Sequence, residues 1–187
     1  MREMVTSAIP RWLAALDEQK PYIEVLDGER LSPMSPYFVH GELAVELAVQ
    51  VRRWAKGRGA VGAEVRFYFD RGDGTWSSLL PDVSYMSFER LPRSMDDRFQ
   101  RPRIAPDIAI EILSPEDRPA RVKRKVETYI EYGATLVVVL DPRMRRVAVH
   151  RRDGTVEERE ARGSWPVAPF DGLVLDWDEA YHDIGIS

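Results

Sequence analysis

The sequence contains no cysteine, and this absence removes a whole group of chemistries. Without cysteine the chain has no disulfide, no thiolate metal site and no thiol nucleophile. No apolar run reaches the length of a membrane-spanning helix, and the first residues lack the uninterrupted apolar segment of a signal peptide. We therefore expect a cytoplasmic protein that does not enter membranes.

Histidine and lysine are also scarce. The histidines His40, His150 and His182 show no metal-ligand spacing, and no glycine-rich phosphate loop is present. Only four lysines occur among the 27 basic residues, and two of them, Lys123 and Lys125, lie close together. Because the very high pKa of arginine makes it a poor proton-transfer group, these two lysines are candidates for chemistry.

Charge is unevenly distributed along the 187 residues, whose net charge is −4. Between Arg90 and Lys125 there are ten basic residues and six acidic ones, and 143–152 adds a second basic cluster. The stretch 171–183 carries five acids and no basic residue. These charges have two interpretations: ordinary solvated surface, or basic segments that contact a nucleic-acid backbone.

Hydrophobic periodicity predicts an α/β (α+β) fold, in which helices flank one twisted mixed β-sheet, with extra hairpins near both termini. A hydrophobic content of 44% suits one domain over residues 1–187. We divide this domain into an N-terminal helix and hairpin (about 9–35), a core (about 36–142) and C-terminal strands (143–187). Helices are predicted at 9–18, 36–56 and 118–132. Strands are predicted at 59–69, 79–87, 107–113, 135–141 and 173–177, with hairpins turning at Asp27-Gly28 and Asp153-Gly154.

One acid stands out in the predicted strand 107–113. Alternation places Asp107, Ala109, Glu111 and Leu113 on one face of this strand, opposite a face made of isoleucines. A carboxylate in such an apolar setting is costly unless it is paired, hydrogen-bonded or bound to a metal. Glu111 is therefore a candidate site residue, whereas Asp107, next to Pro106 at the strand start, fits a capping role better.

Asp82 has a similar setting, at the start of an apolar strand. If the two strands are neighbours, Asp82 and Glu111 converge at one edge of the sheet. Two carboxylates with a backbone carbonyl and waters suit Mg²⁺ or Mn²⁺, which prefer oxygen ligands. Lys123 or Lys125, on the helix that follows, could stabilise developing negative charge or help to position an attacking hydroxide. The alternatives are that Asp82 caps its strand and that Lys125 lies on a solvated helix face.

Four fragments in this order are similar to a known family. "PDV" at 81–83, "APDIAIEILSP" at 105–115, Lys125 with Tyr129, and "YGATLVVVLDP" at 132–142 resemble the Uma-type restriction-endonuclease family, formerly a domain of unknown function. This family belongs to the PD-(D/E)XK nuclease superfamily, and the similarity spans roughly residues 20–160. The resemblance implies a restriction-endonuclease-like core over 36–142 and cleavage of DNA with Mg²⁺ or Mn²⁺.

The resemblance also implies a role for individual residues. Asp82 matches the first metal-binding aspartate, Glu111 the acid of the (D/E)XK element, and the main-chain carbonyl of Ile112 a further ligand. Leu113 stands where the superfamily usually has lysine, so the Uma-type pattern points to a migrated Lys125 supported by Tyr129. Possible supporting residues are Glu46, or Glu42 in its place, from the first core helix, Glu64 on the next strand, and His40.

The leading functional hypothesis is a metal-dependent endonuclease that hydrolyses DNA phosphodiester bonds. Its DNA contacts would come from Arg93, Arg98, Arg101, Arg103, Arg121 and Arg124. A homodimer is expected, because two related sites most simply cut both strands of a duplex. The alternatives are a catalytically inactive nuclease-fold module that binds nucleic acid or protein, and a metal-dependent hydrolase of another phosphate ester.

Overall fold

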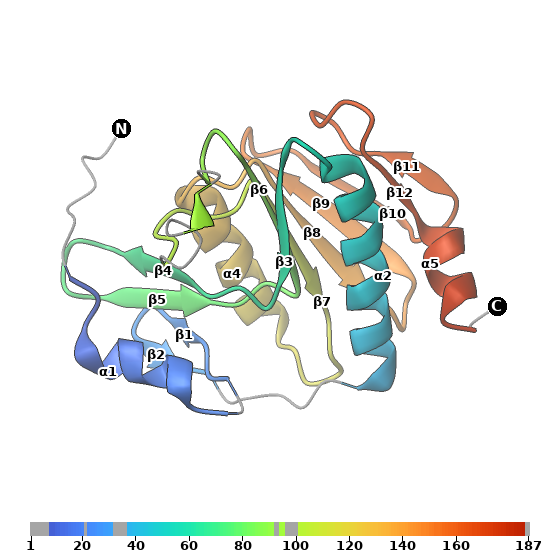
Figure 1. Ribbon diagram of the computed structural model, residues 1–187. Coiled ribbons are helices and arrows are strands. Elements are labelled where there is room, and N and C mark those ends of the chain that lie inside the picture. Colours follow the sequence, from blue (N-terminus) through green and yellow to red (C-terminus); the bar gives the residue numbers. More distant parts are fainter. Residues whose placement is uncertain (1–7, 21, 32–36, 92–93, 96–100, 186–187) are drawn as a thin grey trace.

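A six-stranded mixed sheet forms the centre of the computed structural model, which describes residues 8–20, 22–31, 37–91, 94–95 and 101–185 (Figure 1). The strand order is β10-β9-β8-β7-β6-β3. Strands β7 and β8 are parallel and every other neighbouring pair is antiparallel. The strands are β3 (Gly59–Ala63), β6 (Val83–Ser87), β7 (Ile108–Ile112), β8 (Leu136–Asp141), β9 (Arg146–Arg151) and β10 (Val156–Glu160). The predicted α/β class with a mixed sheet is confirmed.

Two long helices cover opposite faces of this sheet (Figure 1). Helix α2 (Phe38–Ala55) packs Leu43, Leu47 and Val51 against the isoleucines of β7. Helix α4 (Pro119–Glu131) packs Val126 and Tyr129 against the opposite face of β7 and β8. The expected division of β7 into two faces is thereby confirmed. Within the described residues no helix is long and apolar enough to cross a membrane.

A second, four-stranded sheet corrects the expectation of a single sheet. Its order is β2-β1-β5-β4, made by β1 (Val25–Leu26), β2 (Glu29–Arg30), β4 (Phe67–Asp70) and β5 (Trp76–Leu79). The predicted strand 59–69 is two strands, β3 and β4, because the backbone between them turns at Glu64, whose φ is 49°. The predicted strand 79–87 is likewise divided, near Pro81, between the end of β5 and the start of β6. Both changes of sheet occur beside Asp82.

The N-terminal segment closes the outer side of this second sheet. Helix α1 (Arg11–Ala14) continues into a 3₁₀ turn η1 (Ala15–Glu18), as predicted for 9–18. Leu13 and Leu16 pack there against Val25, Tyr68 and Trp76. The hairpin predicted at Asp27-Gly28 is formed by β1 and β2. Both turn residues have positive φ, which suits this tight turn.

The C-terminal segment lies against helix α2. Strand β12 (Val174–Asp176) is the strand predicted at 173–177, and it pairs with β11 (Ser164–Pro166), which sequence patterning did not predict. Helix α5 (Trp177–Asp183) was also not predicted; the Asp176 side chain caps it by accepting a hydrogen bond from the Glu179 N–H. Gln50 of α2 exchanges two hydrogen bonds with the backbone of Asp176, which fixes this segment on α2.

Candidate active site

The pairing of β6 with β7 brings two of the predicted acids together. These strands are antiparallel, with Val83 opposite Ile110, so Asp82 precedes β6 at the level of Glu111. The Ile112 N–H donates a 2.6 Å hydrogen bond to the Asp82 carboxylate. The two strands are therefore neighbours, and Asp82, Glu111 and the backbone of Ile112 meet at one edge of the sheet.

The carboxylate of Glu111 is buried and holds two donors from helix α4. The Tyr129 hydroxyl donates to its Oε1 atom over 2.7 Å, and the Lys125 ammonium donates to its Oε2 atom. Lys125 and Tyr129 lie four residues apart, so they project from the same face of α4. Glu111 thus connects strand β7 to the following helix, α4.

Burial and charge oppose each other in this cluster. Burial raises the pKa of Glu111 to about 8, although the Lys125 ammonium acts to lower it. Burial alone would lower the pKa of Lys125, but Glu111 and Glu24 outweigh it and raise that pKa. Glu24 provides a second carboxylate that faces the same ammonium. Lys125 is therefore a fixed cation at this site.

Glu24 is a site residue that sequence reasoning missed. It lies just before β1, and its Oε2 atom is 3.1 Å from the Lys125 ammonium. Its Oε1 atom accepts a 2.7 Å hydrogen bond from the Leu80 N–H, next to the change of sheet. The sequence pattern that identified Glu111 could also have identified Glu24. Glu24 is likewise a single acid between apolar neighbours, Ile23 and Val25.

His40 reaches the same edge from the first turn of α2. Its Nε2 atom lies 3.3 Å from the Asp82 carboxylate. Burial alone would lower the pKa of His40, but the contact with Asp82, helped by the backbone of Ile112, raises it overall. The imidazole is therefore held as a donor beside Asp82.

These groups surround a cavity of about 130 Å³. Five acids contribute to its wall, together with His40, Arg121 and Lys125. The lining residues are Tyr22, Glu24, Leu31, His40, Glu64, Leu80, Asp82, Glu111, Ile112, Ser114, Asp117, Arg121 and Lys125. Every residue of the predicted metal and catalytic set is among them, and so are the predicted supporting residues Glu64 and His40; Tyr129 reaches the site through Glu111.

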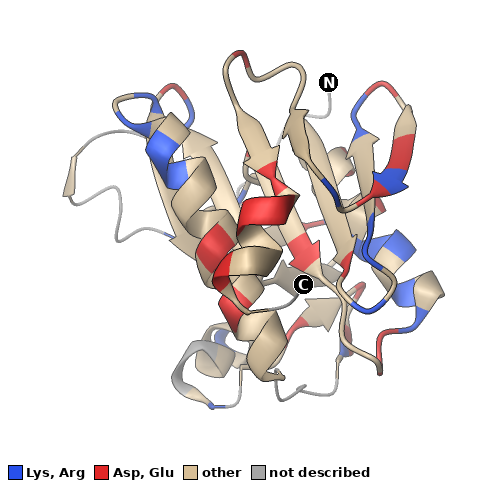
Figure 2. Ribbon diagram, turned by 90° about the vertical axis from the view of Figure 1, so that its right-hand side faces the viewer, with Lys and Arg blue, Asp and Glu red and all other residues tan. Residues whose placement is uncertain are grey.

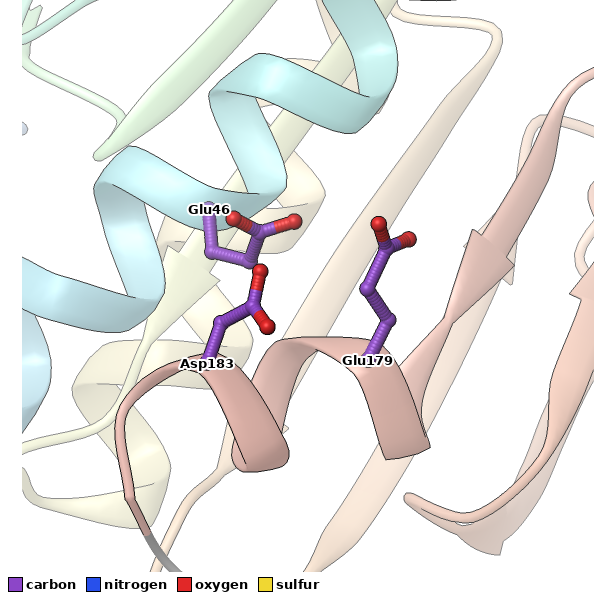
Figure 3. Close-up of side chains that lie close together, drawn as sticks. All are labelled: Glu46, Glu179 and Asp183. Atoms are coloured by element: carbon purple, nitrogen blue, oxygen red, sulfur yellow. The ribbon is translucent and has the colours of Figure 1, made fainter.

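The predicted acid of the first core helix does not join this cavity. Neither Glu46 nor Glu42 is among its lining residues. Glu46 instead faces Glu179 and Asp183 of α5 (Figure 3). One carboxylate oxygen of each of these three residues lies within 4.8 Å of the others. Gln50 donates to Glu46, and Arg53 forms an ion pair with Glu179, so neighbouring donors already contact two of these acids.

The predicted DNA-contacting arginines are scattered. Arg121 lines the cavity, whereas the Arg124 guanidinium forms an ion pair with Asp27, with a 2.6 Å contact. Arg101 lies over the Tyr68 ring, 5.8 Å from its centroid, and Arg103 precedes β7 on the described chain. Arg93 and Arg98 lie outside the described residues.

Asp107 has a structural role, as the sequence suggested. Its carboxylate accepts hydrogen bonds from the Ser87 N–H and the Arg90 guanidinium, each over 2.7 Å. These contacts connect the start of β7 to the end of β6. Asp107 therefore shares a strand face with Glu111 without sharing its surroundings.

Comparison with known proteins gives two results that agree. A family model named Uma2 and described as "Putative restriction endonuclease" matches residues 9–179. The solved structure of a "putative nuclease belonging to DUF820" from Anabaena variabilis superposes with a TM-score of 0.75 at 26% sequence identity. That superposition covers 88% of this chain and 92% of the Anabaena chain. Comparison with curated proteins gives no match.

Proposed function

Because this chain belongs to the Uma2 family, described as "Putative restriction endonuclease", we propose that it is a metal-dependent endonuclease that hydrolyses DNA phosphodiester bonds. The observation that carries this proposal is the meeting of Asp82, Glu111 and Lys125 at one cavity of about 130 Å³. Asp82 lies just before β6, Glu111 on β7 and Lys125 on α4. A buried cluster of acids and one fixed cation is costly to maintain, which favours a functional origin.

The types of ligand group around the cavity are those that suit a hard divalent cation. Carboxylates and a backbone carbonyl are the ligands that Mg²⁺ and Mn²⁺ prefer. Asp82, Glu111 and the Ile112 carbonyl would hold the ion, while the contacts of His40 with Asp82 and of Tyr129 with Glu111 orient the two carboxylates. When bound, the ion would supply Lewis-acid stabilisation of phosphate charge and a more acidic water.

Lys125 is best suited to act as a cation. Its raised pKa keeps the ammonium protonated, so it cannot accept a proton from water near neutral pH. A protonated amine at the cavity wall can instead balance the negative charge that develops on a phosphate in the transition state. Arg121, also in the wall, adds a second positive group for a DNA backbone.

One observation favours a second candidate, a nuclease-fold module that binds without turnover. Both oxygens of Glu111 accept hydrogen bonds from this chain's own residues, Lys125 and Tyr129. Leu113 also stands in place of the usual lysine. If both contacts persist with nucleic acid bound, each Glu111 oxygen keeps only its remaining lone pair for a metal ion, and the adjacent Lys125 ammonium opposes a cation there.

The test is DNA cleavage by the purified full chain with Mg²⁺ or Mn²⁺. We expect the wild type to nick or cut plasmid DNA, and Asp82→Ala and Glu111→Ala to abolish cleavage. Glu46→Ala is the matched control, since this acid lies outside the cavity, and it should keep wild-type activity. Calorimetric titration with Mn²⁺ separates the two candidates: no cleavage and no ion binding by the wild type would favour the binding module.

A further inference from the structure

Helix α2 has an outward face with the pattern of a helix–helix seam. Phe38, Glu42, Val45, Val49, Arg52 and Lys56 follow one another at steps of four and three residues. This spacing keeps side chains on one stripe of a helix and is the repeat of a coiled coil. The stripe, which we call the α2 seam, lies opposite the core residues Leu43, Leu47 and Val51.

The apolar members of the α2 seam are exposed to an unusual degree. Phe38 is 84% exposed, Val45 67% and Val49 36%. Gly41 beside them has nothing within 4 Å of the position a side chain would take, so another backbone can approach closely there. Three large apolar groups aligned on one exposed helix face are typical of a contact surface.

Charge divides the same seam into two halves. Glu42 lies on the N-terminal half, while Arg52 and Lys56 lie at the C-terminal end, and all three are partly or fully exposed. Figure 2 shows the basic residues at one end of α2 and acidic residues where α2 and α5 adjoin. A seam with opposite charges at its two ends is complementary to its own reversed copy.

We propose that a second copy of this chain packs on the α2 seam, with the two α2 helices antiparallel about a two-fold axis. Centred between Val45 and Val49, this arrangement places Val45 opposite the partner's Val49. The same register places Glu42 opposite the partner's Arg52 and Phe38 opposite the partner's Lys56. Opposed helix dipoles favour the antiparallel sense, whereas a parallel pair would place Glu42 against Glu42 and Arg52 against Arg52.

A hollow at the end of the seam provides a place for Phe38. The hollow has a volume of about 570 Å³ and lies where the C-terminal end of α2 meets β3, the edge strand of the six-stranded sheet. Val49, Ala60, Val61 and Phe88 give it an apolar wall. Lys56 also lines this hollow. Because the antiparallel register places the partner's Phe38 opposite Lys56, it brings the ring of the partner's Phe38 to the rim of the hollow.

The chemistry of the seam favours a second copy over nucleic acid. Exposed valines and Glu42 would be buried against phosphates without compensation, whereas a reversed copy pairs each group of the seam. One helix and one hollow per copy form an interface near the lower end of specific contacts, about 1,200 Å² in total. We therefore expect dissociation constants on the order of micromolar.

Sedimentation equilibrium of the full chain tests this interface. Wild type should show twice the chain mass of 21.5 kDa at concentrations of tens of micromolar. Val45→Arg should sediment as a monomer with an unchanged circular dichroism spectrum. Val156→Arg, at a 53% exposed position on β10, is the control and should remain dimeric. A monomeric wild type, or a dimer that Val45→Arg leaves intact, overturns the proposal.

Two further measurements test the register. Glu42→Arg and Arg52→Glu should each weaken the dimer at least about tenfold, and the double variant should recover most of the wild-type affinity. Because the chain has no cysteine, disulfide formation reports contacts cleanly. A mixture of Val45→Cys and Val49→Cys proteins should cross-link faster than either alone. Additive charge effects, or faster cross-linking of Val45→Cys with itself, would contradict the antiparallel register.

Discussion

The ammonium of Lys125 lies 3.1 Å from the carboxylate of Glu24, which precedes β1 of the four-stranded sheet. The same ammonium donates to Glu111 of the six-stranded sheet. The N-terminal hairpin and the six-stranded sheet thus share one cation. A buried cation without a partner is strongly unfavourable. Glu24 would keep Lys125 paired if Glu111 turned towards another ligand, so it is a positioning residue for Lys125.

Glu24→Gln should therefore impair the site more than the fold. The amide oxygen can still accept from the Leu80 N–H, but the second negative charge beside Lys125 is lost. We expect the rate constant of DNA cleavage to fall by about 10- to 100-fold with little change in KM, as small misplacements of catalytic groups commonly do.

Single-turnover kinetics and urea unfolding of the same preparation separate these two effects. Glu29→Gln, an exposed acid on the adjacent strand β2, is the matched control and should behave as wild type. If Glu24→Gln cleaves as fast as this control, Glu24 does not position Lys125.

Lys125→Met should destabilise the protein because it removes the ammonium that contacts both Glu24 and Glu111. Loss of one partner of a buried ion pair typically costs about 3–5 kcal/mol of unfolding free energy. Because burial raises the pKa of Glu111 to about 8, this carboxyl is mostly neutral near pH 7 and charged only at higher pH. Adding Glu111→Gln should therefore return more of the loss at pH 9 than at pH 7. Urea unfolding at these two pH values measures both effects.

The control for this pair is Lys123→Met, whose ammonium is on a side chain that is 79% exposed. It should change the unfolding free energy by about 0.5 kcal/mol or less. Equal effects of the two lysine substitutions would mean that the Lys125–Glu111 contact contributes nothing to stability.

The cap of helix α5 predicts a defined dependence of stability on pH. Hydrogen bonds from the Glu179 N–H and the Ser164 hydroxyl lower the pKa of Asp176 below its ordinary value of 3.8. The charged form is thus favoured in the folded state, so its contribution is complete above pH 3.8 and is lost as the pH falls through the lower folded pKa.

Asp176→Ala should lower the unfolding free energy at pH 7 by about 1 kcal/mol, the usual contribution of such a cap. The difference from wild type should shrink in acid. Asp178→Ala, an acid in the first turn of α5, is the control. A difference between Asp176→Ala and wild type that grows on acidification would contradict the lowered pKa.

Arg121 and Arg124 should contribute differently to DNA binding, although they are three residues apart on α4. Arg121 lines the cavity, whereas the Arg124 guanidinium is held by Asp27. Arg121→Ala should weaken binding and reduce the slope of log affinity against log salt by about 0.9, the value for one phosphate contact.

Arg124→Ala should leave that slope unchanged. Fluorescence anisotropy with a labelled duplex in Ca²⁺, over a series of salt concentrations, gives both slopes. If both substitutions reduce the salt slope by the same amount, the bound DNA extends over the β1–β2 hairpin and is not centred on the cavity.

Local patterns predicted the elements of this fold better than their grouping into sheets. Alternation in 107–113 was enough to assign the two faces of β7, because each face packs against a different helix. The division of 59–69 was not visible, since it depends on a positive φ at Glu64 that a non-glycine residue adopts only in a particular tertiary setting. Strand β11 was missed because its three residues form a strand only through β12.

The candidate site shows the same limit. Glu111 was recognisable from its apolar neighbours, whereas Lys125 was singled out only by the resemblance to the Uma-type family. The contact between Lys125 and Glu24 joins distant parts of the chain, and no local periodicity encodes it. The preference for Glu46 came only from its place on the first core helix, and the structure brings that side chain to α5 instead.

The alternation of β7 also guards against misfolding. A slip of one residue between β6 and β8 would move Glu111 into the apolar layer beneath α2 and turn the isoleucines towards the cavity. Both changes are unfavourable, because a carboxylate would lose its donors and apolar area would be exposed to water. The five residues of β7 therefore favour the native pairing with β6 and β8. The same pairing directs the Glu111 side chain to the cavity.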